Sequence, residues 1–192
     1  HIDEQYLNLI AKLLKDGNQK GDRTGVGTKS LFSTELRHDM STGFPLLTCK
    51  FTPFKQIFIE LMWFLRGETN IKPLIEAGCN IWTGDCYKNY VNRTNQLIGH
   101  GFHGTLLSEE AFVERIKTDY EFSSTWGELG PIYGYQWRWK GNDQLRTILN
   151  TLKSDPDSRR LLVSSWDVEN IKNMVLPPCH FAFEFYTREL TD

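Results

Sequence analysis

The most apolar stretch of the chain, Phe51–Leu65, constrains the fold most, because a single glutamate stands in it among large hydrophobic side chains. Pro53 suits the first turn of a helix and Gly67 its end, so the pattern predicts a helix over Phe54–Arg66. Apolar residues occupy all sides of this helix, which predicts that it is buried. The segment is too short to span a bilayer and also carries Lys55. We therefore expect this helix in the core of a globular domain.

The glutamate, Glu60, lies in the middle of this helix. Burying an unpaired carboxylate is costly, so we expect Glu60 to be protonated, paired or hydrogen-bonded. Two interpretations stay open from the residues alone. Glu60 is either a structural partner for a backbone or arginine group, or an acid that handles protons with a pKa raised by desolvation.

Size and composition predict a single domain over residues 1–192. The chain has 22 Lys and Arg against 24 Asp and Glu, and a net charge of −2 gives no overall field for nucleic acid or an acidic membrane. Its four cysteines are scattered without a CxxC pair, which is typical of a reduced, cytoplasmic protein rather than a disulfide scaffold. The polar N-terminal segment shows no signal peptide.

Hydrophobic periodicity predicts the remaining elements. We expect helices over residues 2–16, 109–118 and from Asp143 to Asp155, strands over 29–38, 161–166 and 181–186, and a long loop or insertion over 85–107. In the helix after Asp143, residues Leu145, Ile148, Leu149 and Leu152 should point inward. Helices and strands mixed without a regular βαβ rhythm indicate the α+β class.

Two arginine-bearing segments are candidates for binding an anion. Arg23 lies on a glycine-rich loop, where its guanidinium and backbone N–H groups could meet a phosphate, although the residues alone favour a plain surface turn. Arg159 and Arg160 precede a strand, and neighbours on a strand point to opposite faces. They either pair with Asp155 or Asp157, or form a phosphate site shared between subunits.

Cys179 is the candidate nucleophile. It follows Leu176-Pro177-Pro178, which stiffens the chain and presents the cysteine at the start of a strand, with His180 next to it facing away. A lone cysteine is also common as a small core residue. An ordinary thiol is only a few per cent thiolate at neutral pH, so nearby guanidinium groups would be needed to favour the anion.

Taken together, these motifs resemble the thymidylate synthase family. In chain order the matching segments are Arg23–Thr28, Phe44–Thr48, Glu60–Gly67, Asn80–Trp82, Gly130–Gly134, Gln136–Arg138, Pro156–Arg160 and Leu176–His180. They cover nearly the whole chain except about residues 85–125, where the family tolerates insertions. The resemblance implies a large twisted mixed β-sheet flanked by helices, with one sheet face forming a homodimer interface.

The resemblance also implies a reaction. Cys179 would add to carbon 6 of the uracil of dUMP, and carbon 5 would take a methylene group from methylenetetrahydrofolate. Loss of the carbon 5 proton and of the tetrahydrofolate, then hydride transfer from that folate to the methylene group, would give dTMP and dihydrofolate. Glu60 would move protons at the base, and Tyr133 would lie beside the nucleophile. No metal ion is implied.

The binding residues implied by the resemblance come from several segments. Arg23 would hold the 5′-phosphate with Arg159 and Arg160 of a second subunit, and the clustered arginines would favour the Cys179 thiolate. On the folate side, the implied residues are Ile81 and Trp82 against the pterin and Lys50 at the glutamate tail.

The sequence departs from the family pattern at Phe51, Pro53, Thr83 and Glu184, and the C-terminal third of that pattern, including the residue that reads the pyrimidine, is absent. We therefore expect a fragment or an incompletely represented protein. Two alternatives stay open. One is a dUMP or dCMP hydroxymethylase of the same superfamily. Trp82 favours the synthase over this alternative, because a ring stacked at the folate would keep out the water that a hydroxymethylase uses. The other is an inactive fragment or a regulator that binds its own mRNA. The nearly neutral net charge argues against RNA as the primary ligand.

Overall fold

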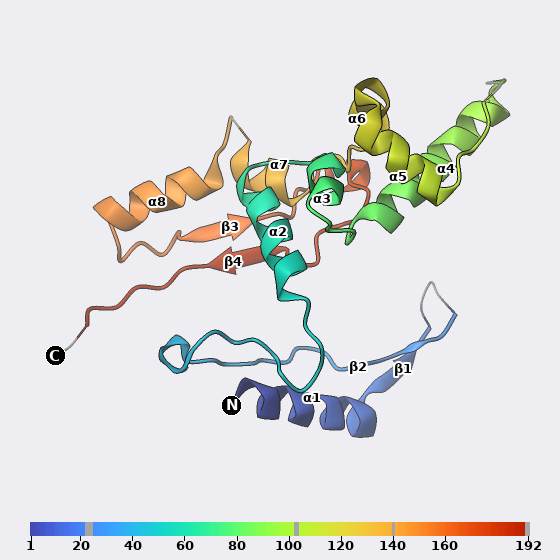
Figure 1. Ribbon diagram of the computed structural model, residues 1–192. Coiled ribbons are helices and arrows are strands. Elements are labelled where there is room, and N and C mark those ends of the chain that lie inside the picture. Colours follow the sequence, from blue (N-terminus) through green and yellow to red (C-terminus); the bar gives the residue numbers. More distant parts are fainter. Residues whose placement is uncertain (22–24, 102–103, 140, 191–192) are drawn as a thin grey trace. The chain divides into compact units, whose positions relative to one another are not determined.

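The computed structural model describes residues 1–21, 25–101, 104–139 and 141–190 (Figure 1). The chain divides into two compact units, an N-terminal unit of residues His1–Phe54 and a C-terminal unit of residues Lys55–Asp192. The mixture of helices and strands confirms the α+β class. None of the described helices is long and apolar enough to cross a membrane.

The elements alternate irregularly along the chain. In order they are α1 (Ile2–Asp16), β1 (Asn18–Lys20), β2 (Thr28–Ser30), the 3-10 helix η1 (Met40–Thr42), α2 (Phe54–Leu65), α3 (Lys72–Glu76), α4 (Thr83–Gly99), α5 (Glu109–Thr118), α6 (Tyr120–Trp126), α7 (Tyr133–Arg138), α8 (Gln144–Ser154), β3 (Leu162–Ser164), the 3-10 helix η2 (Ile171–Asn173) and β4 (Ala182–Glu184). The helices predicted over 2–16, 54–66, 109–118 and after Asp143 are confirmed within one or two residues.

The N-terminal unit consists of α1, the antiparallel pair β1–β2 and an extended segment. The strand predicted over residues 29–38 is wrong beyond Ser30, where β2 ends. Further on, the chain is held by a side chain instead of a strand: Gln5 donates to the Arg37 carbonyl at 2.6 Å and accepts from the Arg37 N–H at 2.9 Å. A side-chain amide can satisfy both backbone groups of one residue in this way, so Arg37 is hydrogen-bonded without a strand partner.

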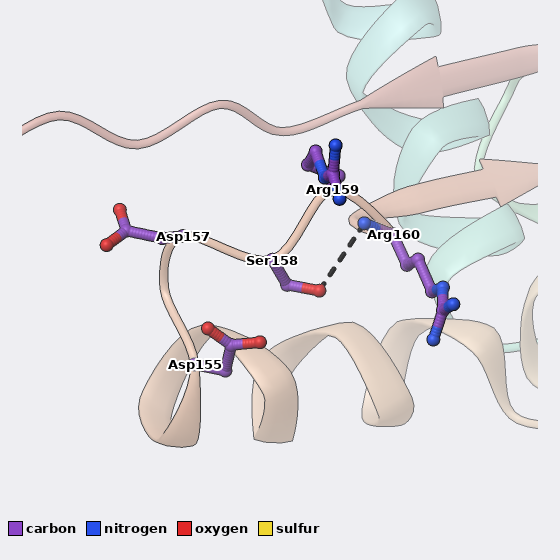
Figure 2. Close-up of a pocket in the computed structure, with 5 residues that line it drawn as sticks. All are labelled: Asp155, Asp157, Ser158, Arg159 and Arg160. Atoms are coloured by element: carbon purple, nitrogen blue, oxygen red, sulfur yellow. Dashed lines mark hydrogen bonds between the residues drawn. The ribbon is translucent and has the colours of Figure 1, made fainter.

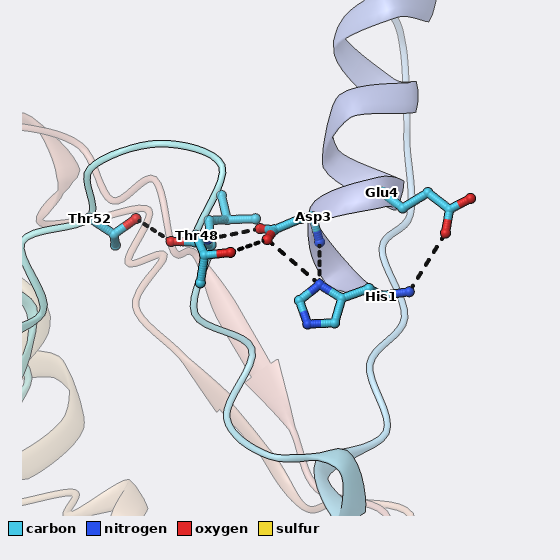
Figure 3. Close-up of polar contacts among 6 residues, drawn as sticks. His1, Asp3, Glu4, Thr48 and Thr52 are labelled. Carbon is cyan, nitrogen blue, oxygen red and sulfur yellow. Dashed lines mark hydrogen bonds and ion pairs between the residues drawn. The ribbon is translucent and has the colours of Figure 1, made fainter.

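A second polar contact in this unit joins the first turn of α1 to residues 47–52 (Figure 3). The Asp3 carboxylate accepts from the Thr48 N–H at 2.9 Å and also from the Thr48 hydroxyl. The Thr52 hydroxyl donates to the Leu47 carbonyl at 3.0 Å. The hydrogen bonds from Thr48 hold the pKa of Asp3 below its usual value.

The C-terminal unit has an aromatic core. Around α2 and α7, the rings of Trp63, Phe64, Trp82, Tyr133 and Trp137 contact one another edge-on or tilted. A second set of rings joins α4, α5 and α6. Its members are Tyr87, Tyr90, Phe112, Phe122 and Trp126. These two clusters fix the helices because interior aromatic pairs contribute both buried area and preferred geometry.

The predicted loop over residues 85–107 is wrong for most of its length, because α4 runs to Gly99. The buried side chains of α4, Thr83, Cys86, Tyr90 and Thr94, are three or four residues apart. They lie on one face of the helix, and packing of that face offsets the weak helix propensity of a segment rich in glycine and asparagine.

Two further predictions about burial are wrong. Helix α2 is buried on one side only: Trp63 and Phe64 are buried, whereas Ile57, Phe58 and Leu61 are 40%, 52% and 44% exposed. The neighbouring elements of the unit pack against a single face of this helix. In α8, Ile148 is buried as predicted, but Leu149 lies one residue, or about 100°, further round and is exposed.

The strand predictions for 161–166 and 181–186 are confirmed as shorter strands, β3 and β4, which pair antiparallel with Val163 opposite Phe183. The large mixed sheet is not formed by the described residues, which contain two separate two-stranded antiparallel sheets. Each of these strands is three residues long and pairs with one other strand.

Candidate functional site

Helix α2 carries Glu60, the first residue of the candidate site. The Trp82 indole N–H donates to Glu60 Oε1 at 2.8 Å, so the expectation that this carboxylate has a hydrogen-bond partner is confirmed. Burial raises the pKa of Glu60, and the Trp82 hydrogen bond and the nearby charge of His180 oppose that rise. Glu60 is therefore an acid that holds its proton to a higher pH than an ordinary glutamate.

Tyr133 is the first residue of α7, and two glycines set its position. Gly130, with φ of +81°, comes so close to the Asn173 carbonyl that a Cβ would lie 2.2 Å from that oxygen. At Gly134 a Cβ would lie 2.2 Å from the Glu68 carbonyl, just beyond the end of α2. The start of α7 can thus lie against the end of α2 because Gly134 has no side chain, and the missing side chain of Gly130 lets the preceding turn lie against Asn173. The Tyr133 ring consequently packs on Phe64, with centroids 4.6 Å apart.

The Tyr133 hydroxyl is hydrogen-bonded to the backbone at Cys179. It accepts from the Cys179 N–H at 2.7 Å and from the His180 N–H at 3.3 Å. The two preceding prolines have no N–H, so Cys179 supplies the first donor after them. Burial raises the pKa of Tyr133, which keeps its hydroxyl protonated. The Cys179 side chain is exposed rather than a core residue.

Glu60, Trp82, Tyr133 and Cys179 are therefore brought together by direct contacts within one unit. The Trp82 and Tyr133 rings are 6.2 Å apart, which links the Glu60 hydrogen bond to the one at Cys179. The arrangement combines an accessible thiol, a phenol and an acid with a raised pKa. Such a set can attack an electron-poor carbon and move protons beside it.

The two residues expected on the folate side differ in exposure. Trp82 is 5% exposed, and its N–H is engaged by Glu60, whereas the neighbouring Ile81 is 47% exposed. Only Ile81 therefore presents a large apolar surface to solvent here, and the contact of Trp82 with a pterin stays a prediction.

Arg159 and Arg160 lie on the exposed turn after α8 and line a shallow pocket with Asp155, Asp157 and Ser158. Figure 2 shows their side chains leaving the turn in different directions, as expected for neighbours. Within the described part of the chain, neither guanidinium has a carboxylate within 4 Å, so the pairing with Asp155 or Asp157 is not formed. Both arginines remain available to an anion.

Two predicted site residues belong to other parts of the chain. Arg23 lies outside the described residues. Lys50 belongs to the N-terminal unit, where its Nζ lies 5.8 Å from the centroid of the Tyr6 ring. Their predicted roles at the phosphate and at the folate tail stay predictions.

Two side-chain contacts that support the site were missed from the sequence. Gln144 bonds to the backbone of both α7 and β3, and the Trp137 indole N–H donates to the buried Ser165 hydroxyl at 2.6 Å. Nothing in the sequence marks these contacts, because the partners lie 8 to 28 positions apart.

The sequence of this chain is similar to those of known proteins. A family model described as thymidylate synthase matches residues 4–191. Among curated proteins, the thymidylate synthase of Mycoplasma mobile is 46% identical over 184 residues, that of Mesoplasma florum 45% over 184, and that of Zymomonas mobilis subsp. mobilis 44% over 191. These matches cover 95–96% of this chain but only 61–62% of the relatives' length.

Proposed function

The chain belongs to the thymidylate synthase family, and from that premise we propose that it acts in the reductive methylation of dUMP to dTMP. One observation carries the proposal. An exposed cysteine, Cys179, is fixed through its backbone by the Tyr133 hydroxyl in the same unit as an acid with a raised pKa, Glu60. These are the groups that addition to a pyrimidine ring requires.

The Cys179 sulfur, as thiolate, bonds to carbon 6 of the uracil, and the electron pair of the 5,6 double bond moves to carbon 5. Glu60 exchanges protons at the base, because burial raises its pKa and makes it a better proton acceptor than an ordinary glutamate. Tyr133 keeps Cys179 in place by accepting its N–H and remains protonated beside the ring.

The phosphate of dUMP is bound by arginines. Arg159 and Arg160 support this part of the proposal because both are exposed on a turn and unpaired with the carboxylates beside them. We assign them to the site of a second subunit in a cytoplasmic homodimer, with Arg23 of the first subunit at the same phosphate. Guanidinium groups suit phosphate because they can donate two parallel hydrogen bonds to it.

Methylenetetrahydrofolate, when bound, supplies the one-carbon unit and the hydride. Ile81 fits a flat ring system, since its apolar side chain is 47% exposed beside the buried Trp82. Trp82 contributes by orienting Glu60 through the 2.8 Å hydrogen bond. Lys50 is the proposed contact for the glutamate tail.

The direct test is mass spectrometry of this chain after incubation with 5-fluoro-dUMP and methylenetetrahydrofolate. We expect a covalent adduct on the peptide that contains Cys179, absent in Cys179→Ser and retained in Cys49→Ser, where the other exposed cysteine is removed. An adduct on any other residue, or none in the wild type, would contradict the proposal.

A second assay separates synthase from hydroxymethylase. With dUMP and methylenetetrahydrofolate, a synthase produces a rise at the dihydrofolate absorbance that Cys179→Ser abolishes. Release of the carbon 5 proton without that rise would identify a hydroxymethylase instead.

A further inference from the structure

One glutamine in the C-terminal unit hydrogen-bonds to the backbone of two other elements. Gln144, the first residue of α8, donates from Nε2 to the carbonyls of Gln136 in α7 and Ser164 in β3, both at 2.8 Å. Its Oε1 accepts from the Ser164 N–H at 2.9 Å. The side chain thus binds both backbone groups of Ser164 as a neighbouring strand would, and adds a bond to α7.

These bonds are part of a closed ring of contacts that includes the nucleophile. From Ser164 the ring passes to β4, because the Ser165 N–H donates to the Phe181 carbonyl at 2.7 Å. Phe181 follows Cys179 and His180, whose N–H groups return to the Tyr133 hydroxyl at the start of α7. The Gln136 carbonyl, one turn along α7, completes the ring at Gln144.

Most of the connections in this ring cannot adjust independently. The register of β3 and β4 is fixed by backbone pairing, and α7 is a rigid helical turn. The Trp137–Ser165 hydrogen bond joins α7 to the residue after β3, one position along from Gln136 and Ser164 on each segment. The separation between the Tyr133 hydroxyl and the Cys179 backbone therefore depends on how α7 is held against β3, and Gln144 supplies three of the hydrogen bonds that hold it there.

We propose that Gln144 is a positioning residue for the nucleophile: by tying α7 to β3, it sets the Tyr133 hydroxyl at hydrogen-bond distance from the Cys179 N–H. The role rests on the proposed function, in which Cys179 is the nucleophile. Gln144 itself touches neither Cys179 nor the substrate. Its effect passes through backbone positions, so it should be visible at the Cys179 amide even without a ligand.

The test is amide hydrogen exchange measured by NMR on the whole chain. In Gln144→Leu we expect the Cys179 amide to exchange about tenfold faster than in the wild type, since loss of the tie weakens its bond to Tyr133. Gln144→Glu retains the acceptor for the Ser164 N–H and loses both Nε2 donors, so it should show the same acceleration. Tyr133→Phe, which removes the acceptor itself, gives the upper limit.

A matched control separates positioning from general loss of stability. Ile116→Val removes one methylene from a fully buried residue of α5, outside the ring, and should leave the ratio of Cys179 exchange to that of the unit's other amides unchanged. The proposal is overturned if Gln144→Leu leaves Cys179 exchange unchanged, if Ile116→Val accelerates it equally, or if Gln144→Glu behaves as the wild type.

Failure of the positioning role and failure of the proposed function can be told apart, because formation of the 5-fluoro-dUMP adduct tests the function alone. A wild-type chain that forms no adduct contradicts the proposed function, and the exchange comparison still decides whether Gln144 positions Cys179. Where the adduct forms, Gln144→Leu should slow its formation about tenfold while Ile116→Val does not, and equal rates in Gln144→Leu and wild type would count against the positioning role.

Discussion

The two units of the chain are held together by different means. In the described residues of the N-terminal unit, Ile2 is the one buried apolar side chain, and Asp3 and Gln5 join its segments by polar contacts. The C-terminal unit contains the rest of the buried apolar core and all six tryptophans. One unit therefore depends on exposed hydrogen bonds, and the other on packed aromatic rings.

This difference corresponds to what each unit contributes to the proposed chemistry. Glu60, Tyr133 and Cys179, which act on the reacting ring, all lie in the packed unit. Arg23 and Lys50, proposed for the phosphate and the folate tail, lie in the N-terminal part of the sequence. Reacting groups must be placed within a fraction of an ångström, which a dense core can do and a few exposed hydrogen bonds cannot.

The largest expected effect is on the aromatic core. Phe112→Ala should lower the free energy of unfolding of the C-terminal unit by about 3–5 kcal/mol, because it leaves a cavity among Tyr87, Tyr90 and Phe122. Urea unfolding followed by tryptophan fluorescence measures this unit alone, since every tryptophan belongs to it.

The control is the same substitution at an exposed phenylalanine, Phe32 in the N-terminal unit. It is fully exposed, so Phe32→Ala should leave the unfolding midpoint unchanged when urea unfolding is followed by circular dichroism, which reports the helices of both units. A comparable loss of stability in both variants would contradict the contrast between the two units.

A smaller effect concerns the pH dependence of the packed unit. Because the folded pKa of Glu60 is raised above 4.5, its protonated form favours folding at low pH, and that stabilisation is lost as the pH rises through the folded pKa. Relative to Glu60→Gln, the wild type should therefore lose stability as the pH rises above 4.5. Urea unfolding followed by circular dichroism at a series of pH values measures this, and a constant difference would show that Glu60 is not desolvated.

The smallest effect is expected at Asp3, whose pKa shift has the opposite sign. Its folded pKa lies below 3.8, so its contribution to stability is present above that value and is lost as the pH falls through the folded pKa. Protection of the Thr48 amide, its exchange rate compared with the intrinsic rate at the same pH, should fall on acidification in the wild type, and less so in Asp3→Asn. Identical acid responses of the two proteins would indicate that the Asp3 carboxylate does not hold residues 47–52.

How far the sequence predicted the molecule also differs between regions. Helices with a clear apolar face and defined ends, such as α1 with Gly17 after it, were predicted well because both signals are local. Helix α4 was missed, although Cys86, Tyr90 and Thr94 have helical spacing, because its glycines and asparagines favour turns. The exposed side of α2 could not be predicted, since the number of faces that neighbours cover is a property of the tertiary structure.

The candidate site was predictable only in part. The isolated acid in α2 and the cysteine after two prolines stood out because each breaks a local rule, and both proved to have specific partners. Gln144 breaks none: glutamine at the start of a helix is unremarkable, and its role arises from segments that meet only in the folded chain.

The distribution of the thiols has a practical consequence. Cys49 and Cys179 are exposed and belong to different units, whereas Cys79 and Cys86 are buried, and burial raises the pKa of Cys86 to about 12. Maleimide spin labels should therefore attach to the native chain at one point on each unit without any engineered cysteine. Pulsed electron resonance between the two labels would then follow the movement of one unit relative to the other.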